Sequence, residues 1–269
     1  MRARIYKLDS FTTKLFSGNP AAVLPLESFL DDTTMQAIAA ENNLAETAFF
    51  VREGNDFRLR WFTPTVEVPF CGHATLASAA VVMERLEPGR ARVVFHSRSG
   101  PLTVERRNGA YLMDFPARRL TPLAPDKKVA DALGTIPVEL CADNLNNYVV
   151  LLDSAQRVRD LTPRLDAILQ LDCTGVIVTA HGDDGYDFVS RYFAPAKGIP
   201  EDPVTGGAHC ALTPFWAKKL GRSEFHAYQA SRRGGSMRCR LAGDRVEIEG
   251  RCVFYLEGDI EDLGAAGER

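Results

Sequence analysis

The chain contains 269 residues, of which 45% are hydrophobic, and its 35 acidic and 32 basic side chains give a formal net charge of −3 at pH 7. This composition argues against a disordered protein, and the mixing of both signs along the chain provides no electrostatic basis for a nucleic-acid partner. The charged first residues and the lack of any run approaching ~18 apolar residues predict neither a secretory signal nor a membrane span, so we expect a soluble, cytoplasmic protein.

Alternating apolar and polar residues predict a strand-rich first half of the chain. Strands are expected at 4–11, 21–24, 47–52, 57–62, 91–96, 102–107 and 110–115, and helices at 31–41 and 74–85. The segment 116–126 contains three prolines and is typical of a linker.

The second half repeats this order of elements. Strands are expected at 148–152, 175–180, 187–193, 237–241, 245–249 and 252–256, and helices at 163–169 and 207–220. The tripeptides 62–64 (FTP) and 193–195 (FAP) are similar, and each is followed by a loop with proline and glycine and then by a helix of small residues. The matching order predicts an internal duplication.

The two apolar helices, near 74–83 and 207–220, indicate the architecture. A helix without a polar face is expected to be enclosed by other elements. We therefore expect an α+β fold of two pseudo-symmetric domains, residues 1–117 and 118–269, each a mixed β-sheet rolled around a central apolar helix. Each helix N-terminus carries unpaired N–H groups and a partial positive charge, so two anion-binding ends are expected to face one cleft between the domains.

Glu46 is the lone carboxylate in the apolar run 44–51, at the start of an expected strand. Apolar neighbours tend to raise the pKa of a carboxyl group, which suits proton transfer near neutral pH. The alternative interpretation is a glutamate at a strand edge that faces water.

His73 lies in the first turn of the first apolar helix, where it could donate to a substrate oxygen or orient a carboxylate. The helix dipole favours its neutral form, and a plain capping histidine is the alternative. Cys71 precedes the same helix end, which could activate a thiolate, although small buried cysteines are common.

Asp202 precedes the second apolar helix, in the run 198–209. Because Asp-Pro is also a turn signal, the alternative is an aspartate that caps backbone N–H groups. Gly206 and Gly207 would let a ligand approach the backbone, although a tight turn alone explains them. Arg233 could reach a substrate carboxylate, and a solvated loop is the alternative there.

Motifs for cofactors and metals are missing from the sequence. Its five histidines form no HExxH pattern, its six cysteines form no CxxC pair, and neither GxxxxGK[ST] nor GxGxxG occurs. These absences predict a protein without a metal site, a nucleotide cofactor or a disulfide framework.

Several ordered motifs together resemble the PhzF-like proteins of phenazine biosynthesis, which share the fold of diaminopimelate epimerase. The matching segments are 9–12 (DSFT), 18–23 (GNPAAV), 43–47 (NLAET), 71–77 (CGHATLA), 201–206 (EDPVTG) and 243–246 (GDRV). The resemblance runs nearly from end to end, and it implies two similar domains with the active site in the cleft between them, usually in a homodimer.

The resemblance also implies an activity and its residues. In the family's phenazine enzyme, the glutamate at the position of Glu46 moves a proton within trans-2,3-dihydro-3-hydroxyanthranilate, helped by the residues that correspond to His73 and Asp202. One carboxylate that acts as both base and acid needs no cofactor. We expect a small carboxylated substrate to contact Asn19, Cys71, Gly72, Thr205, Gly206, Gly207 and Arg233.

Two departures from the family pattern concern the substrate. Gly207 stands where the phenazine enzyme has a serine, so one hydroxyl that faces the substrate is missing. Cys71 matches the first of the two opposed cysteines of related epimerases, but the second falls near Thr205, and threonine is a poor base at neutral pH. The sequence therefore predicts a cofactor-independent isomerase with Glu46 as general acid and base. The alternatives are a small-anion binding or regulatory protein on the same scaffold and a cysteine-assisted amino-acid epimerase.

Overall fold

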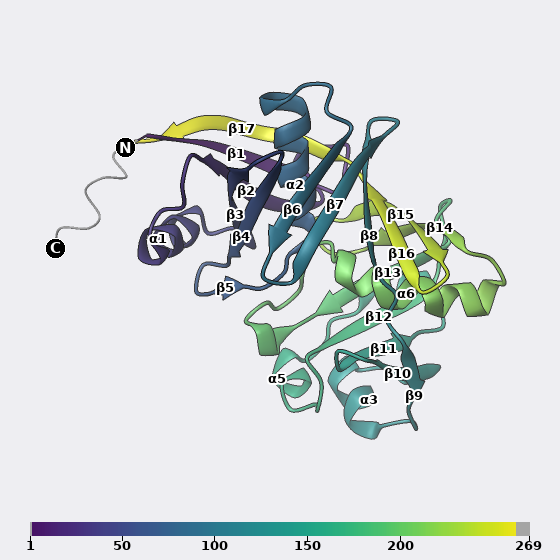
Figure 1. The fold of residues 1–269 in the computed structure, drawn as a ribbon. Coiled ribbons are helices and arrows are strands. Elements are labelled where there is room, and N and C mark those ends of the chain that lie inside the picture. Colours follow the sequence, from purple (N-terminus) through teal and green to yellow (C-terminus); the bar gives the residue numbers. More distant parts are fainter. Residues whose placement is uncertain (1, 262–269) are drawn as a thin grey trace. The chain divides into compact units, whose positions relative to one another are not determined.

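The structure is a computed structural model that describes residues 2–261 (Figure 1). The described residues form two compact units: unit 1 contains residues 2–114 and 249–261, and unit 2 is Phe115–Ile248. Among the described helices, none combines the length and the apolar character that a membrane crossing requires.

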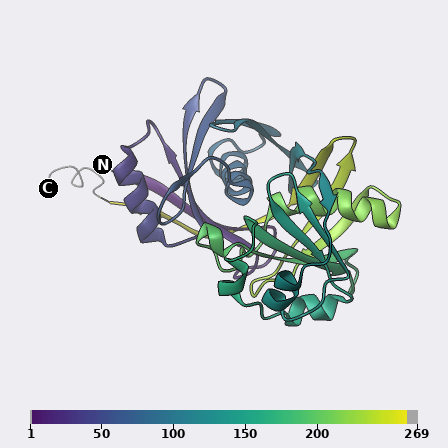
Figure 2. The same ribbon diagram turned by 90° about the horizontal axis from the view of Figure 1, so that it is seen from below.

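Unit 1 is a mixed sheet that curves around one helix. Its strands are β1 Ala3–Ser10, β2 Asn19–Leu26, β3 Glu46–Glu53, β4 Asp56–Phe62, β5 Glu67–Val68, β6 Arg92–Ser97, β7 Gly100–Arg107, β8 Ala110–Pro116 and β17 Cys252–Ile260. Its helices are α1 Asp32–Asn42 and α2 Gly72–Val81, and α2 continues into a π-helical turn, η1 Val82–Leu86. Figure 2 shows α2 nearly end-on inside the ring of strands.

Local chemistry accounts for both helices of unit 1. The carboxylate of Asp31 accepts a hydrogen bond from the N–H of Thr34 at 2.8 Å and caps α1, and Asn43 ends this helix in the left-handed conformation. Every residue of α2 from His73 to Val81 is buried, as expected for a helix without a polar face.

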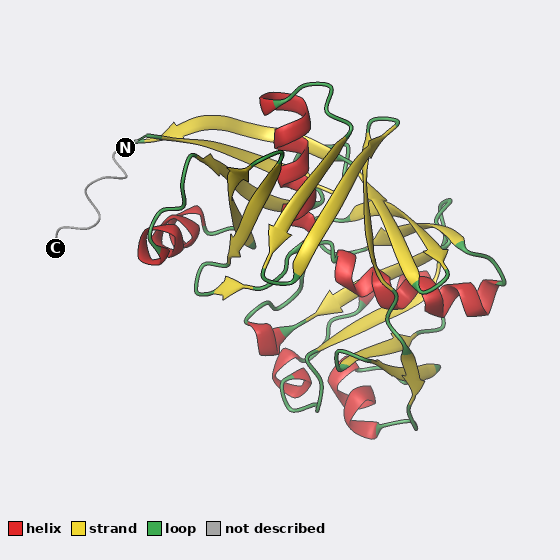
Figure 3. Ribbon diagram, viewed as in Figure 1, coloured by secondary structure: helices red, strands yellow, loops and turns green. Residues whose placement is uncertain are grey.

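Unit 2 also surrounds an apolar helix with a mixed sheet (Figure 3). Its strands are β9 Leu120–Pro122, β10 Glu139–Asp143, β11 Asn147–Leu151, β12 Gly175–His181, β13 Phe188–Phe193, β14 Glu224–Gln229, β15 Gly235–Ala242 and β16 Arg245–Gly250. Its helices are α3 Lys127–Leu133, α4 Ala155–Asp160, α5 Leu165–Ile168 and α6 Gly206–Leu220, with a 3-10 turn, η2 Pro195–Lys197. Most of α6 is buried, whereas Lys218 and Lys219 in its last turn are not.

The pairing pattern of the strands supports the predicted duplication. In unit 1, β1/β2 is antiparallel, β2/β3 parallel, β3/β4 antiparallel, β4/β6 parallel and β6/β7 antiparallel. In unit 2, the pairs β10/β11, β11/β12, β12/β13, β13/β14 and β14/β15 follow the same alternation. In unit 1, α2 precedes β6 in the chain, the second strand of the parallel pair β4/β6. In unit 2, α6 precedes β14, the second strand of the parallel pair β13/β14. The predicted α+β class is therefore confirmed.

The division of the chain differs from the predicted one at its end. The sequence placed residues 118–269 together, but β17 pairs antiparallel with β1, with Ala3 opposite Ile260 and Ser10 opposite Cys252. The segment from Glu249 onward thus belongs to unit 1. Sequence periodicity predicts that a segment is a strand, but it does not say which distant strand will be its neighbour.

Gly18, which immediately precedes β2, is a backbone position where a side chain cannot fit. Its φ is +70°, and an added Cβ would lie 2.1 Å from the carbonyl oxygen of Ser10. We expect Gly18→Ala to lower the free energy of unfolding by roughly 3 kcal/mol, because a left-handed alanine adds to a backbone clash. Gly54→Ala is the control, since its φ is +63° and nothing lies within 4 Å of the added Cβ. Urea denaturation of both variants measures the difference, and equal losses would contradict this account.

Candidate active site

Glu46 and His73 meet in unit 1 through the ends of two elements. Glu46 is the first residue of β3, and it lies opposite Ala21 in the parallel pair of β2 and β3. His73 is the second residue of α2. The Oε2 atom of Glu46 lies 3.3 Å from Nε2 of His73, and the two side chains are only 12% and 6% exposed. A carboxylate is thus held against an imidazole in a site with little water.

His73 is neutral at physiological pH. Burial lowers its pKa to about 4, although a hydrogen bond to the carbonyl of Pro20 opposes this shift. A neutral imidazole carries one N–H donor and one acceptor nitrogen. Its Nδ1 atom lies 3.4 Å from Sγ of Cys71, the residue that precedes α2. The ring therefore has the carboxylate of Glu46 beside one nitrogen and the thiol of Cys71 beside the other.

These three side chains are also a set of possible metal ligands. One ligand atom from each of Glu46, Cys71 and His73 lies within 4.8 Å of the others. No short-range spacing in the sequence indicates this set, because Glu46 is distant in sequence from the other two. However, Sγ and Oε2 contact different ring nitrogens, so a single ion could bind all three residues only after the imidazole reoriented.

Asp202 belongs to a hydrogen-bonded group at the start of α6 in unit 2. Its Oδ2 atom accepts a 2.6 Å hydrogen bond from the hydroxyl of Thr205, the residue before α6. The side-chain amide of Gln229 donates to the carbonyl of Asp202 at 2.7 Å, and its oxygen accepts from the N–H of Thr205 at 2.8 Å. Gln229 is fully buried at the end of β14. It fixes the loop before α6, and sequence reasoning missed it because it lies 24 residues beyond Thr205.

The other predicted substrate contacts fall into the same two groups. Asn19 begins β2 in unit 1, and Gly72 begins α2 beside His73. In unit 2, Gly206 and Gly207 are the first two residues of α6, whose leading N–H groups have no partner within the helix. Arg233 lies in the turn 231–234, which the hydroxyl of Ser231 joins to the carbonyl of Pro203 at 2.7 Å.

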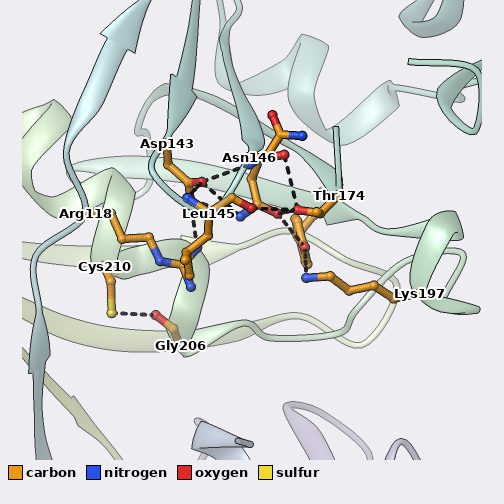
Figure 4. Close-up of polar contacts among 10 residues, drawn as sticks. Arg118, Asp143, Leu145, Asn146, Thr174, Lys197, Gly206 and Cys210 are labelled. Atoms are coloured by element: carbon orange, nitrogen blue, oxygen red, sulfur yellow. Dashed lines mark hydrogen bonds and ion pairs between the residues drawn. The ribbon is translucent and has the colours of Figure 1, made fainter. Parts of the chain in front are cut away.

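A polar network near α6 was not predicted; Asp143, Asn147 and Tyr192 in it are buried, whereas Lys197 is exposed (Figure 4). Asp143 accepts a 2.8 Å hydrogen bond from Nη1 of Arg118 and a 3.0 Å bond from the amide of Asn147. The amide oxygen of Asn147 accepts from the hydroxyl of Tyr192, which in turn accepts from Nζ of Lys197, each at 2.9 Å. The signal in the sequence is a single Arg-Arg pair inside the expected linker, which gives no indication of its distant partners.

Burial, hydrogen bonds and neighbouring charges shift the pKa values of three residues in this network. Burial raises the pKa of Asp143, but hydrogen bonds from Asn147 and Arg118 outweigh it, so the pKa lies below the usual range and the carboxylate stays ionised. Burial lowers the pKa of Lys197, and the positive charge of Arg118 lowers it further. Burial and then the charge of Asp202 raise the pKa of Tyr192.

A pocket of about 790 Å³ lies in unit 2 beside this network. Its lining combines the linker segment, β10, the middle of α6 and the turn before β16: Pro116, Ala117, Arg118, Arg119, Leu120, Pro122, Glu139, Cys141, Pro214, Phe215, Lys218, Leu241, Gly243 and Asp244. Two arginines and a lysine line it together with apolar side chains. The sequence did not predict this pocket, because four separate segments form it.

The burial of His209 can be tested through the pH dependence of the unfolding free energy. Its Nδ1 donates to the carbonyl of Thr205 at 2.8 Å, and burial lowers its pKa to about 4, although that hydrogen bond opposes the shift. Because the folded pKa lies below the unfolded value of about 6.5, the neutral ring stabilises the fold fully above pH 6.5 and less as the pH falls toward 4. His209→Asn keeps a donor for Thr205 but cannot titrate. Between pH 7 and pH 5 the wild type should lose about 2 kcal/mol more unfolding free energy than this variant.

Urea denaturation at the two pH values measures this loss. His181→Asn is the matched control for the substitution itself, because His181 is exposed. An equal loss in wild type and His209→Asn would show that this histidine does not control the acid sensitivity.

Comparisons with known proteins identify the family. Residues 8–258 match the family described as phenazine biosynthesis-like protein, PhzC-PhzF. An uncharacterized isomerase of Pseudomonas aeruginosa is 47% identical over 260 residues, which cover 97% of this chain and 99% of the relative. The crystal structure of a PhzF-family phenazine biosynthesis protein of Enterococcus faecalis matches with a TM-score of 0.94 and 42% identity, over 97% of this chain and 99% of that chain.

A more distant similarity concerns the fold alone. A hydroxyproline epimerase of Agrobacterium vitis matches with a TM-score of 0.63 and 10% identity, over 96% of this chain and 92% of that chain. The expected epimerase-like fold is thus confirmed, and the match over nearly the whole length decides the family. The chain belongs to the phenazine biosynthesis-like PhzC-PhzF family.

Proposed function

We propose that this protein is an isomerase that moves a proton within a small carboxylated substrate, with Glu46 as both general base and general acid. The isomerase class agrees with the name of the Pseudomonas relative. The observation that carries the proposal is the contact of 3.3 Å between Oε2 of Glu46 and Nε2 of a buried, neutral His73. A carboxylate with little water around it and a neutral imidazole beside it suits proton transfer to and from carbon.

In this mechanism Glu46 removes a proton from one carbon of the substrate and returns it to another. The electron pair of the broken C–H bond moves into the conjugated part of the substrate, so no oxidant or reductant is needed. His73 orients the carboxylate of Glu46 and polarises the substrate, and Asp202 assists on the same substrate. The N–H groups at a helix N-terminus hold the substrate carboxylate, because helix N-termini favour anions.

The experiment is NMR of trans-2,3-dihydro-3-hydroxyanthranilate incubated with the protein in D₂O. The proposal predicts isomerisation of the compound, with deuterium at the receiving carbon in those turnovers in which the protonated Glu46 exchanges with solvent before it returns the proton. If this compound does not react, other unsaturated carboxylates are tested in the same way, and lack of isomerisation of all of them would refute the proposal. Homodimer formation and a cytoplasmic location belong to the same proposal, and analytical ultracentrifugation of the purified protein tests the dimer.

A second candidate is a binding protein that holds a small anion without turnover. Gly207 favours it, because the first turn of α6 offers backbone N–H groups but no side-chain hydroxyl at this position. In the same NMR experiment this candidate predicts broadened ligand signals without deuterium uptake.

A further inference from the structure

We propose that Arg118 determines the substrate specificity of this protein by donating a charged hydrogen bond to an anionic group at the first turn of α6. The class of substrate it selects is a carboxylate, in preference to the neutral amide of the same shape. This inference rests on the proposed function, since it assigns a specificity residue to that site.

The guanidinium of Arg118 is held on one side and free on the other. Its Nη1 donates to Asp143 at 2.8 Å, and the Asp143 side chain is fully buried, whereas that of Arg118 is 18% exposed. Within residues 2–261, no other side-chain or backbone acceptor is hydrogen-bonded to this guanidinium. The remaining N–H groups, on Nη2 and Nε, are therefore available to a ligand (Figure 4).

Gly207 brings the free side of the guanidinium to the helix end. A Cβ added at this glycine would lie 3.0 Å from Nη2 of Arg118, which is closer than side chains normally pack. Gly207 does not have the positive φ that would require glycine for backbone reasons. The absence of a side chain here instead leaves room for Arg118 beside the leading N–H groups of α6. A carboxylate at this place would meet a charged planar donor and backbone N–H groups together.

A proline in α6 fixes the backbone of Arg118. Pro214 lies inside the helix and has no N–H to donate to the carbonyl four residues earlier, that of Cys210. The N–H of Arg118 donates to this carbonyl instead, at 2.9 Å. This hydrogen bond attaches the segment that carries Arg118 to α6. Any other residue at position 214 would have an N–H that competes with Arg118 for the carbonyl of Cys210. With its backbone tied to Cys210 and its Nη1 to Asp143, Arg118 is preorganised for binding.

The test compares two probes of the same shape, anthranilate and the neutral 2-aminobenzamide, by isothermal titration calorimetry. The wild type should bind anthranilate more tightly. Arg118→Met should weaken anthranilate about 10- to 100-fold and change 2-aminobenzamide little, since a hydrogen bond from a charged donor contributes that much. Arg164→Met is the control: Arg164 also belongs to unit 2, but its side chain is 65% exposed and does not line the pocket beside Arg118, so the same charge is lost without an effect on the preference.

Gly207→Ala provides a second variant in case Arg118→Met fails to fold. It retains the pair of Arg118 with Asp143 but displaces Nη2, so the preference for anthranilate should fall several-fold. A wild type without preference for the carboxylate would overturn the inference. An undiminished preference for anthranilate over 2-aminobenzamide in Arg118→Met would also overturn it. If Arg118→Met does not fold, the same result in Gly207→Ala would overturn it.

Glu46→Gln separates this inference from the proposed function. If Arg118 is responsible for the preference but Glu46→Gln still transfers protons like wild type, the proposed function fails and the inference stands. If Glu46→Gln abolishes proton transfer but the preference does not depend on Arg118, the inference alone fails.

Discussion

Glu46→Gln should reduce the rate of proton transfer by roughly 10²- to 10⁴-fold, the contribution typical of a positioned general acid or base. Glutamine has nearly the same shape as glutamate and can still lie in contact with His73, but it cannot accept a proton from carbon. The measurement is the rate of substrate isomerisation followed by NMR in D₂O, with circular dichroism to verify folding.

Glu53→Gln is the control within the same strand. Glu46 begins β3 and Glu53 ends it, but Glu53 is exposed, so this variant loses the same charge away from the site. It should retain the wild-type rate. Equal rates in wild type and Glu46→Gln would refute the general-base role. If Cys71→Ser lost activity in that case, the thiol beside Nδ1 of His73 would be the base, as in a cysteine-assisted epimerase.

Asp143→Ala should lower the free energy of unfolding by roughly 3 to 5 kcal/mol, the cost of removing one partner from a buried ion pair. Asp143 accepts from the guanidinium of Arg118, from the amide of Asn147 and from the backbone N–H groups of Leu145 and Asn147. Alanine would leave a buried positive charge and several donors without acceptors.

Asp131→Ala is the matched control for this change. Its carboxylate pairs with Lys127 at 2.6 Å along α3, but the Asp131 side chain is 57% exposed, so water replaces the lost contact. We expect a loss below about 0.5 kcal/mol. Urea denaturation at pH 7 compares the two variants. Similar losses would mean that the network around Asp143 stabilises the fold no more than a surface ion pair does.

The sequence predicted the elements that hydrophobic periodicity makes visible. Helix α1 was expected at 31–41 and spans Asp32–Asn42, and the first β-strand was expected at 4–11 and spans Ala3–Ser10. Strand β14 was missed, since its inward positions are Phe225, Ala227 and the polar Gln229, so apolar alternation stops after two residues. Helix α3 was missed because its seven residues directly follow a proline-rich segment that reads as a linker.

The site could be predicted only where its signal is local. Glu46 interrupts an apolar run, and His73 follows a glycine at a helix start, so both are visible in a short window. The roles of Gln229 and Arg118 depend on partners 24 and 25 residues away, and no spacing rule connects such pairs. The sequence shows that Gly207 lacks a side chain, but the proximity of this position to Arg118 arises only in the tertiary structure.

The pairing of β1 with β17 has a consequence for synthesis on the ribosome. Arg4 and Asp259 form a hydrogen bond 255 positions apart in sequence, so the sheet of unit 1 cannot be complete until β17 has been made. Unit 2 is one continuous segment, and all its strands emerge earlier. Unit 1 therefore begins before unit 2 but is completed after it, and until then β1 has one edge without its final neighbour, the condition in which strands aggregate or recruit chaperones.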